Sequence, residues 1–377
     1  MEKKKTIIIE AQRVFRKKKH GMDFVALGLI RELQKIDTYN NYIIAVGPGE
    51  DVCLYESSNF KIKILPSTNY LIWEQLLLPK LVKYSKADIL HCTSNTAPVL
   101  GKVALVLTLH DIIFMEGKMG KNASWYQKLG RIYRRFIVPR ILNKVSELIT
   151  VSNFEKDNII ERYPELKHKT NVVYNGVSAD FKPLVSLPTD TELEQMERGS
   201  YWLFLGNTDP KKNMANTLLG YTNYLKRSEV KRRLLLLDSN GEVLNKMLEE
   251  LDIVWIKPYL YIKGYISHSK LPEWYSYAFG SLYTSLRESF GLPLIEAMSC
   301  GTPVVASNTS AIPEVAGECV VYADPSDPNA IGNAMILLET DDVLRTANIE
   351  KGLIHSKKYS WENTARETLS LYRKLIN

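Results

Sequence analysis

Short apolar runs alternate along the chain with longer segments whose apolar residues recur at helical spacing. The short runs are rich in β-branched residues, as buried strands are. After the first run, apolar residues between Phe24 and Leu33 recur at near-helical spacing and predict a helix. This alternation indicates parallel sheets covered on both faces, which is the α/β class. The predicted strands are Thr6–Ile9, Tyr42–Val46, Phe60–Ile64, Ile89–His91, Ala104–Leu109, Leu148–Val151, Val172–Tyr174, Tyr201–Leu205, Arg233–Leu237, Leu260–Lys263, Ser281–Thr284, Pro303–Ala306 and Val320–Tyr322.

The alternation is interrupted once, by a segment with two prolines, four acidic residues and no apolar strand. We interpret this segment as a linker, and the length of 377 residues fits two domains better than one. Two successive strand–helix series predict two facing Rossmann-like domains, whose ligands would lie beyond the carboxyl ends of the strands, in the interdomain cleft. A final amphipathic helix follows Ser360, which is a suitable N-cap. The predicted segments are a first domain of residues 1–182, a linker of residues 183–199, a second domain of residues 200–358 and a C-terminal helix of residues 359–377.

Composition excludes several classes of protein. Hydrophobic residues make up 45% of the chain and charged residues 24%, which is globular composition. No apolar stretch approaches the roughly 18 residues of a membrane span. The apolar run near the N-terminus is too short for a signal peptide, so we expect a cytoplasmic protein. The cysteines have no CxxC spacing, predict neither a zinc site nor a disulfide framework, and suit a reducing compartment; they are Cys53, Cys92, Cys300 and Cys319.

Positive charge is concentrated in the first half of the chain. Residues 1–180 contain 28 lysines and arginines against 18 acidic residues, a net charge of +10, whereas residues 181–377 contain 21 against 24, a net charge of −3. One predicted helix in the first half combines apolar residues with a row of basic ones. Either these basic residues are simply solvated, or they dock the protein on an anionic lipid surface. The basic residues of this helix are Lys128, Arg131, Arg134, Arg135 and Arg140.

The stretch from Ser285 to Val305 carries the most informative chemistry. After a predicted strand, a turn over Arg287–Gly291 leads into a helix that Pro293 can begin and Gly301 can end. Backbone N–H groups at such a helix start bind anions. Two carboxylates, eight residues apart, flank this start; they could accept hydrogen bonds from sugar or ribose hydroxyls, or could be surface glutamates beside a helix cap. The groups concerned are the amides of Ser289, Phe290, Gly291 and Leu292 and the carboxylates of Glu288 and Glu296.

This stretch resembles the donor-binding segment of the GT4 family, which are retaining glycosyltransferases of the GT-B fold that use nucleotide sugars. The resemblance rests on the E-x7-E pair within E-S-F-G-L-P-L-I-E-A-M-S-C-G-T-P-V-V, and it continues through residues 307–317 and 324–327. It implies that Glu288 contacts hydroxyls of the donor sugar, that Glu296 holds the nucleotide ribose, and that the amides of residues 290–292 lie near the sugar and the diphosphate. It also implies a C-terminal helix that packs back on the first domain, and no bound metal or cofactor.

A lysine-bearing turn resembles a second motif of the family, G…P-R-K-N. It runs from Gly206 to Asn213 after a predicted strand, and Lys212 matches the lysine that binds the diphosphate. Lys211 stands in place of the usual arginine, and Asn207 in place of an arginine that some members carry after the glycine. Two adjacent lysines at a helix start oppose the helix dipole, which favours an anionic ligand beside them.

The first domain contributes two further candidates. His110, at the carboxyl end of a predicted strand, resembles the histidine of the family's HD motif, which reaches the donor sugar. Gly21, preceded by His20, resembles a glycine loop near the phosphates and the acceptor, in which the family often has two glycines. In the second domain, a strand-end segment whose backbone meets the base in the family is matched by Gly264, Tyr265 and Ile266.

The resemblance implies transfer of a hexose with retention at the anomeric carbon, with His110, Lys212 and Glu288 as the catalytic residues. Because the D-P-K-K-N turn resembles mannosyltransferase-type members, we expect GDP-mannose as the donor, with UDP-hexoses as the alternative. We expect a glycan or lipid-linked acceptor in surface polysaccharide synthesis, and a position on the inner face of the plasma membrane if the basic helix binds lipid. Two other functions stay open: a GT-B-like sugar-nucleotide epimerase, and a non-enzymatic polyanion-binding protein. No aromatic platform for nucleic acid is recognisable, so no nucleic-acid partner is expected.

Overall fold

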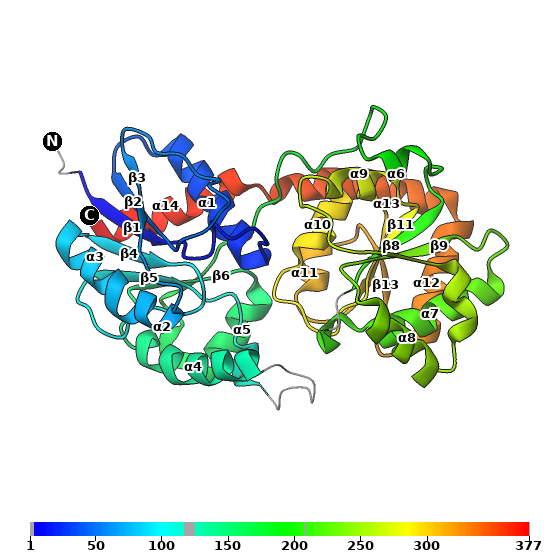
Figure 1. Cartoon of the computed structure of the whole chain (residues 1–377), viewed down its shortest axis with the longest axis horizontal. Coiled ribbons are helices and arrows are strands. Elements are labelled where there is room, and N and C mark those ends of the chain that lie inside the picture. The colour runs from blue at the N-terminus through cyan, green and yellow to red at the C-terminus, as the bar shows by residue number, and fades with distance from the viewer. Residues whose placement is uncertain (1–3, 117–124, 207–208, 377) are drawn as a thin grey trace. The chain divides into compact units, whose positions relative to one another are not determined.

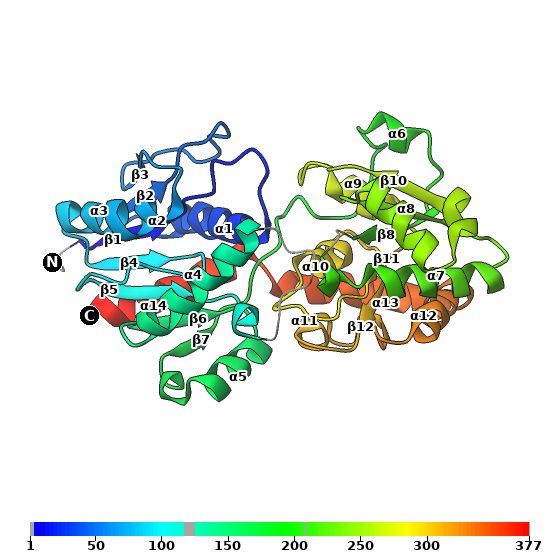
Figure 2. The same ribbon diagram turned by 60° about the horizontal axis from the view of Figure 1, so that its bottom comes forward.

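The computed structural model describes residues 4–116, 125–206 and 209–376. The chain divides into two compact units: unit 1 contains residues 1–176 and 360–377, and unit 2 contains residues 177–359. Within each unit, helices lie on both faces of one parallel sheet (Figure 1 and Figure 2). None of the helices in these described ranges is long and apolar enough to cross a membrane.

The sheet of unit 1 has the strand order β3-β2-β1-β4-β5-β6-β7, and every pair is parallel. Its apolar runs are continuous because both faces are covered: Ile7 and Ile9 pack on the side of α1 and α14, whereas Ile8 packs on the side of α3 and α4. The strands are β1 (Thr6–Glu10), β2 (Asn41–Val46), β3 (Phe60–Ile64), β4 (Ile89–Cys92), β5 (Ala104–Thr108), β6 (Glu147–Thr150) and β7 (Thr170–Val172). The helices are α1 (Gly21–Ile36), α2 (Tyr70–Ile72), η1 (Trp73–Leu77), α3 (Leu78–Ser85), η2 (Ile113–Met115), α4 (Trp125–Leu142), α5 (Asn153–Arg162), η3 (Pro164–Leu166) and α14 (Trp361–Ile376).

The C-terminal helix α14 packs on unit 1, which confirms the expectation from the family resemblance. Its start is capped as predicted, because the amide of Asn363 donates a hydrogen bond to Ser360 Oγ at 3.1 Å. Trp361 then covers α1 so closely that a Cβ on Gly28 would lie 2.4 Å from the indole ring. Further along, the Tyr372 hydroxyl lies 2.5 Å from Nδ1 of the buried His91 in β4. The last helix is therefore an integral layer of unit 1.

The sheet of unit 2 has the strand order β10-β9-β8-β11-β12-β13, again all parallel. The strands are β8 (Tyr201–Leu205), β9 (Arg233–Leu237), β10 (Leu260–Lys263), β11 (Gly280–Tyr283), β12 (Val304–Ser307) and β13 (Val321–Ala323). The helices are α6 (Thr191–Glu194), η4 (Pro210–Lys212), α7 (Met214–Arg227), α8 (Gly241–Glu250), η5 (Val254–Tyr259), α9 (Leu271–Tyr277), α10 (Leu292–Ser299), α11 (Ile312–Ala316), α12 (Pro328–Thr340), α13 (Asp342–His355) and η6 (Ser356–Lys358). In both sheets the first strand of the series is central, so loops that carry candidate residues leave from neighbouring strand ends.

Residues 183–199, interpreted from the sequence as a linker, pack on unit 2. Within them, Leu193 of α6 is completely buried. The Glu273 carboxylate of α9 accepts hydrogen bonds from the backbone amides of Thr189 at 2.8 Å and Asp190 at 3.0 Å. The boundary between the units therefore lies at residues 176 and 177, earlier than the end of the first domain expected at residue 182.

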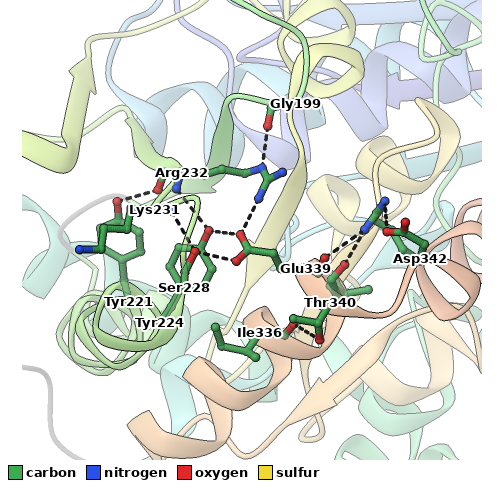
Figure 3. Close-up of polar contacts among 12 residues, drawn as sticks. Gly199, Tyr221, Tyr224, Ser228, Lys231, Arg232, Ile336, Glu339, Thr340 and Asp342 are labelled. Atoms are coloured by element: carbon green, nitrogen blue, oxygen red, sulfur yellow. Dashed lines mark hydrogen bonds and ion pairs between the residues drawn. The ribbon is translucent and has the colours of Figure 1, made fainter.

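A buried carboxylate joins two helices of unit 2 near the start of β9 (Figure 3). Glu339 of α12 accepts hydrogen bonds from Ser228 Oγ at 2.6 Å, from Arg232 Nη1 at 2.5 Å and from the Tyr224 hydroxyl of α7. Arg232 also donates to the carbonyl of Gly199 at 2.9 Å. Because Arg232 precedes β9, this network lies at the amino ends of the strands, and its two charges neutralise each other. The network fixes α7 against α12. It lies at the opposite edge of the sheet from the candidate site, which is at the carboxyl ends of the strands.

Candidate functional site

The turn that follows β8 holds Lys212 at the carboxyl edge of the unit 2 sheet. Asn213 adopts a left-handed conformation with φ +62° and is the N-cap residue directly before α7. Its side-chain amide donates to the carbonyl oxygens of Thr284 at 3.0 Å and Pro325 at 2.6 Å. These carbonyls belong to the segments after β11 and β13, so the lysine turn is tied to two other strand ends of the same sheet.

Lys212 pairs with Glu288 in the loop before α10. Lys212 Nζ lies 2.6 Å from Glu288 Oε1, and the two side chains are only 18% and 11% exposed. Burial by itself would raise the pKa of Glu288, but the positive charges of Lys212 and Lys211 outweigh it, and the pKa lies below its ordinary value. The backbone amide of Glu288 donates to Ser310 Oγ at 3.0 Å, which fixes the loop. The carboxylate is therefore ionised at neutral pH and held in place at this edge.

The start of α10 presents backbone N–H groups beside this pair. Gly291 has φ +110°, a conformation that favours glycine, and a Cβ there would lie 3.2 Å from Tyr283 Oη. No acceptor for the amides of Gly291 and Leu292 is found in the described part of the chain. Phe290 is buried edge-on against Tyr359, with ring centroids 5.5 Å apart, and anchors the turn. Free amides at the positive end of the helix dipole can bind an anion.

Tyr283, the last residue of β11, is a polar group of this site that sequence reasoning missed. Its hydroxyl is buried, makes no hydrogen bond of normal geometry with a described residue and interacts only weakly with the Glu288 carboxylate. The centroid of its ring lies 5.7 Å from Lys212 Nζ. Burial, and then the negative charge of Glu288, raise the pKa of Tyr283 well above its ordinary value, so the hydroxyl stays protonated. A buried hydroxyl without a hydrogen bond of normal geometry calls for an explanation, and a polar ligand beside the Lys212–Glu288 pair supplies one. Tyr283 lies in an apolar strand sequence, and such a sequence does not indicate that the hydroxyl lies beside Lys212 and Glu288.

Glu296, inside α10, is held by a second residue that the sequence did not reveal. His268 Nε2 lies 2.8 Å from Glu296 Oε1, and Glu296 is 6% exposed. His268 lies in the loop between β10 and α9, four residues after Gly264. This contact brings the loop that contains the candidate base-binding segment, Gly264–Ile266, next to Glu296.

His110 lies at the carboxyl end of β5 in unit 1, as predicted. Its ring is buried, Nε2 lies 2.9 Å from the carbonyl oxygen of Thr93, and its backbone amide donates to Asn95 Oδ1 at 2.7 Å. A carbonyl only accepts, so Nε2 carries the proton. Burial lowers the pKa of His110, so the ring is neutral near pH 7 and Nδ1 keeps its lone pair. The imidazole can accept a hydrogen bond from a hydroxyl group through Nδ1.

Gly21 is the first residue of α1, at the carboxyl end of β1. The backbone amide of His20 donates to Asp23 Oδ2 at 2.9 Å, and Asp23 also pairs with Arg13 Nε at 3.1 Å. Lys19 is buried and pairs with Asp51. Two basic residues of the loop before α1, Arg13 and Lys19, therefore form ion pairs that stabilise this loop.

The structure brings some of the predicted residues together and separates others. In unit 2, Lys212, Glu288 and the turn over Ser289–Leu292 share one edge, with Glu296 further along the same helix. The Lys211 side chain is half-exposed, 4.0 Å from the Asp209 carboxylate, and acts on Glu288 through its charge. Its backbone carbonyl accepts a hydrogen bond from the Leu286 amide at 2.7 Å, which ties the lysine turn to the segment after β11. His110 and Gly21 belong to unit 1. Asn207 lies outside the described residues.

Comparisons with known proteins agree with this architecture. Residues 190–353 match the profile described as Glycosyl transferases group 1, and residues 20–181 match Glycosyltransferase Family 4. The O-antigen chain mannosyltransferase B of Escherichia coli is 32% identical over 278 residues, which cover 72% of this chain and 70% of that protein. The O-antigen chain mannosyltransferase RfbU of Salmonella typhimurium is 25% identical over 281 residues, 74% of this chain and 72% of that protein. The solved structure of a sucrose-phosphate synthase from Thermosynechococcus elongatus superposes with a TM-score of 0.73 at 19% identity and covers 99% of both chains. The chain is thus a glycosyltransferase with the GT-B fold and belongs to the GT4 family.

Proposed function

We propose that this glycosyltransferase transfers mannose, with retention at the anomeric carbon, from GDP-mannose to a glycan or lipid-linked acceptor in surface polysaccharide synthesis. The observation that carries the donor site is the pair of half-buried Lys212 and buried Glu288, beside the amides of Gly291 and Leu292 that have no acceptor in the described part of the chain. The preference for mannose is supported by the two relatives described as O-antigen chain mannosyltransferases. UDP-hexoses are the alternative donors.

The pair supplies both kinds of contact that a nucleotide sugar needs. The Lys212 ammonium and the amides of Gly291 and Leu292 would stabilise the negative charge that grows on the leaving diphosphate. The Glu288 carboxylate, released from Lys212, would accept hydrogen bonds from sugar hydroxyls. His110 Nδ1 would accept another from the donor sugar. In this scheme the fixed positive groups of the chain stabilise the charge of the diphosphate, a role that a bound cation has in other transferases. Glu288 is a ligand of sugar hydroxyls rather than a nucleophile.

A donor panel followed by product analysis tests the proposal. Calorimetric titration of GDP-mannose, UDP-glucose and UDP-galactose into the full chain identifies the donor, and NMR of the product reports the anomeric configuration. We expect saturable binding of GDP-mannose and an α-linked product. A β-linked product would overturn retention. Conversion of the nucleotide sugar without any acceptor would favour the epimerase instead.

We also propose that the outer face of α4 docks on anionic lipid. Among the described side chains of α4, three large apolar ones are exposed, at 45% for Leu129, 63% for Ile132 and 55% for Phe136. The Arg140 guanidinium lies 3.5 Å from the centroid of the Phe136 ring, and Lys128 is exposed at the other end of the row. An apolar row flanked by cations fits the boundary between headgroups and acyl chains.

Not every basic residue of α4 is available for lipid. Arg131 Nε and Arg135 Nε donate to the carbonyl oxygen of Phe114 at 2.9 and 2.7 Å, so they fix η2 to α4. Sedimentation with phosphatidylglycerol vesicles is expected for the wild type and is expected to weaken in Ile132→Glu. Val343→Glu, at an exposed apolar position of α13 in unit 2, is the matched control. Equal sedimentation of the wild type and Ile132→Glu, or none by the wild type, would refute docking through α4.

A further inference from the structure

The environment of Glu296 contains a residue whose role the donor-site scheme does not explain. Glu296 is buried on α10, and among the described residues its carboxylate receives one side-chain hydrogen bond, from His268 to Oε1 at 2.8 Å. Oε2 receives none from the part of the chain that the structure describes, so its lone pairs remain available to a ligand. A carboxylate this deeply buried needs a donor to compensate for lost hydration.

His268 is itself fixed by its surroundings. Its ring packs on Phe181, with centroids 4.9 Å apart, and its side chain is 27% exposed. The loop that carries it turns through a hydrogen bond from the Lys270 amide to the Ser267 carbonyl at 2.9 Å. Phe181 also packs against Tyr275 of α9, at 6.2 Å between ring centroids. The imidazole is therefore held between a buried aromatic ring and the carboxylate.

We propose that His268 is a positioning residue for the nucleotide ribose. By donating from Nε2 to Oε1, it holds the Glu296 carboxylate in one rotamer, so that Oε2 meets a ribose hydroxyl without a further loss of side-chain freedom on binding. The same contact ties the β10–α9 loop to α10. The inference deepens the proposed function and rests on the assignment of Glu296 to the ribose.

Deoxynucleotides separate this role from a general structural one. GDP and its 2′-deoxy and 3′-deoxy analogues, or the UDP series if UDP binds better, are titrated calorimetrically into the full chain. In the wild type we expect at least one deoxy analogue to bind about tenfold more weakly, the usual range for a hydrogen bond to a charged group. In His268→Ala we expect the affinity for the ribonucleotide to fall about fivefold and the deoxy penalty to shrink to about twofold.

Controls distinguish the possible failures. His268→Gln keeps an N–H donor and is expected to recover most of the deoxy penalty, and His168→Ala, at an exposed histidine of unit 1, is expected to behave as wild type. A deoxy penalty that is unchanged in His268→Ala would overturn the positioning role. If Glu296→Gln also keeps the full penalty, the assignment of Glu296 to the ribose fails. If no nucleotide binds the wild type, the donor site as a whole fails.

Discussion

Replacing Lys212 by methionine removes the charge beside Glu288 and keeps the length of the side chain. With 2.6 Å between Nζ and Oε1, the attraction between two unit charges is about 6 kcal/mol at an effective dielectric constant of about 20. Desolvation of both groups offsets part of this, and removing one partner of a buried pair costs about 3–5 kcal/mol. Because the Lys212 side chain is 18% exposed, we expect a loss at the lower end of this range. Lys212→Met should lower the local free energy of unfolding by about 3 kcal/mol.

The pH dependence of this loss has a definite sign. In the wild type, the pKa of Glu288 lies below its ordinary value of 4.5, so the carboxylate stabilises the fold above pH 4.5 and the stability is lost as the pH falls through the folded-state pKa. In Lys212→Met the largest of the lowering causes is gone, and we expect burial to outweigh the remaining ones, Lys211 and a hydrogen bond from Ser285, and to raise the pKa of Glu288. The ionised carboxylate then destabilises the fold, and protonation relieves the penalty as the pH falls toward 4.5. The difference in stability between Lys212→Met and the wild type should therefore shrink on acidification.

Hydrogen exchange of the amides in β11 and α10 measures this difference locally, which matters because the chain has two units that need not unfold together. Lys246→Met is the matched control, because Lys246 is 76% exposed and lies 3.7 Å from Glu250 on the surface of α8, where an ion pair contributes less than about 1 kcal/mol. Unchanged protection in Lys212→Met, or a loss of protection that does not vary with pH, would refute this account of the pair.

Three further predictions concern single groups. Gly291→Ala should destabilise unit 2 by about 1–2 kcal/mol in chemical denaturation, because φ is +110° and the new Cβ lies 3.2 Å from Tyr283 Oη; Gly241→Ala, whose Cβ meets nothing within 4 Å, should not, and equal stabilities would contradict the strain. Tyr283→Phe should leave the melting temperature nearly unchanged, because its hydroxyl makes no hydrogen bond of normal geometry with a described residue, but lower kcat/KM for transfer up to about tenfold; a loss of stability without a loss of rate would mean a structural hydroxyl. Burial, and then repulsion from His110 when that ring is protonated, lower the pKa of His91 to about 3, so the unfolded state binds the extra proton and His91 alone should cost unit 1 about 1.4 kcal/mol per pH unit as the pH falls from 6.5 to about 3, in addition to the contribution of His110; denaturation of His91→Asn should show a flatter slope, and an identical slope would exclude this source.

Local signatures made one side of the site predictable. Gly291, Pro293 and Gly301 mark a turn, a helix start and a helix end through the backbone conformations these residues favour, and α10 runs from Leu292 to Ser299 between them. The thirteen predicted strands all exist, four of them with the predicted bounds and the others with ends shifted by at most two residues; β7 begins at Thr170 rather than at residue 172. Hydrophobic periodicity and turn-forming residues are local features, so they can be recognised in the sequence without knowledge of the fold.

The partners of the two glutamates were not predictable in the same way. Lys212 precedes Glu288 by 76 residues, and His268 precedes Glu296 by 28, and only the order of strands in the sheet brings them together. The resemblance supplied Lys212, but nothing marked His268 among the polar residues of its loop. The segment predicted as a linker also could not be placed from local composition. Its prolines and acidic residues are typical of a linker, whereas the burial of Leu193 depends on contact with α9, which lies far along the chain.

The most direct test of the donor site is the rate of transfer from radiolabelled GDP-mannose to a lipid-linked glycan fraction by the wild type, Glu288→Gln and Glu250→Gln. Glu288 is buried beside Lys212, whereas Glu250 lies on the surface of α8, so the same change in charge is made inside and outside the site. We expect Glu288→Gln to keep the fold and lose at least about hundredfold in kcat, and Glu250→Gln to keep the wild-type rate. A wild-type rate in folded Glu288→Gln would contradict the assignment of the site.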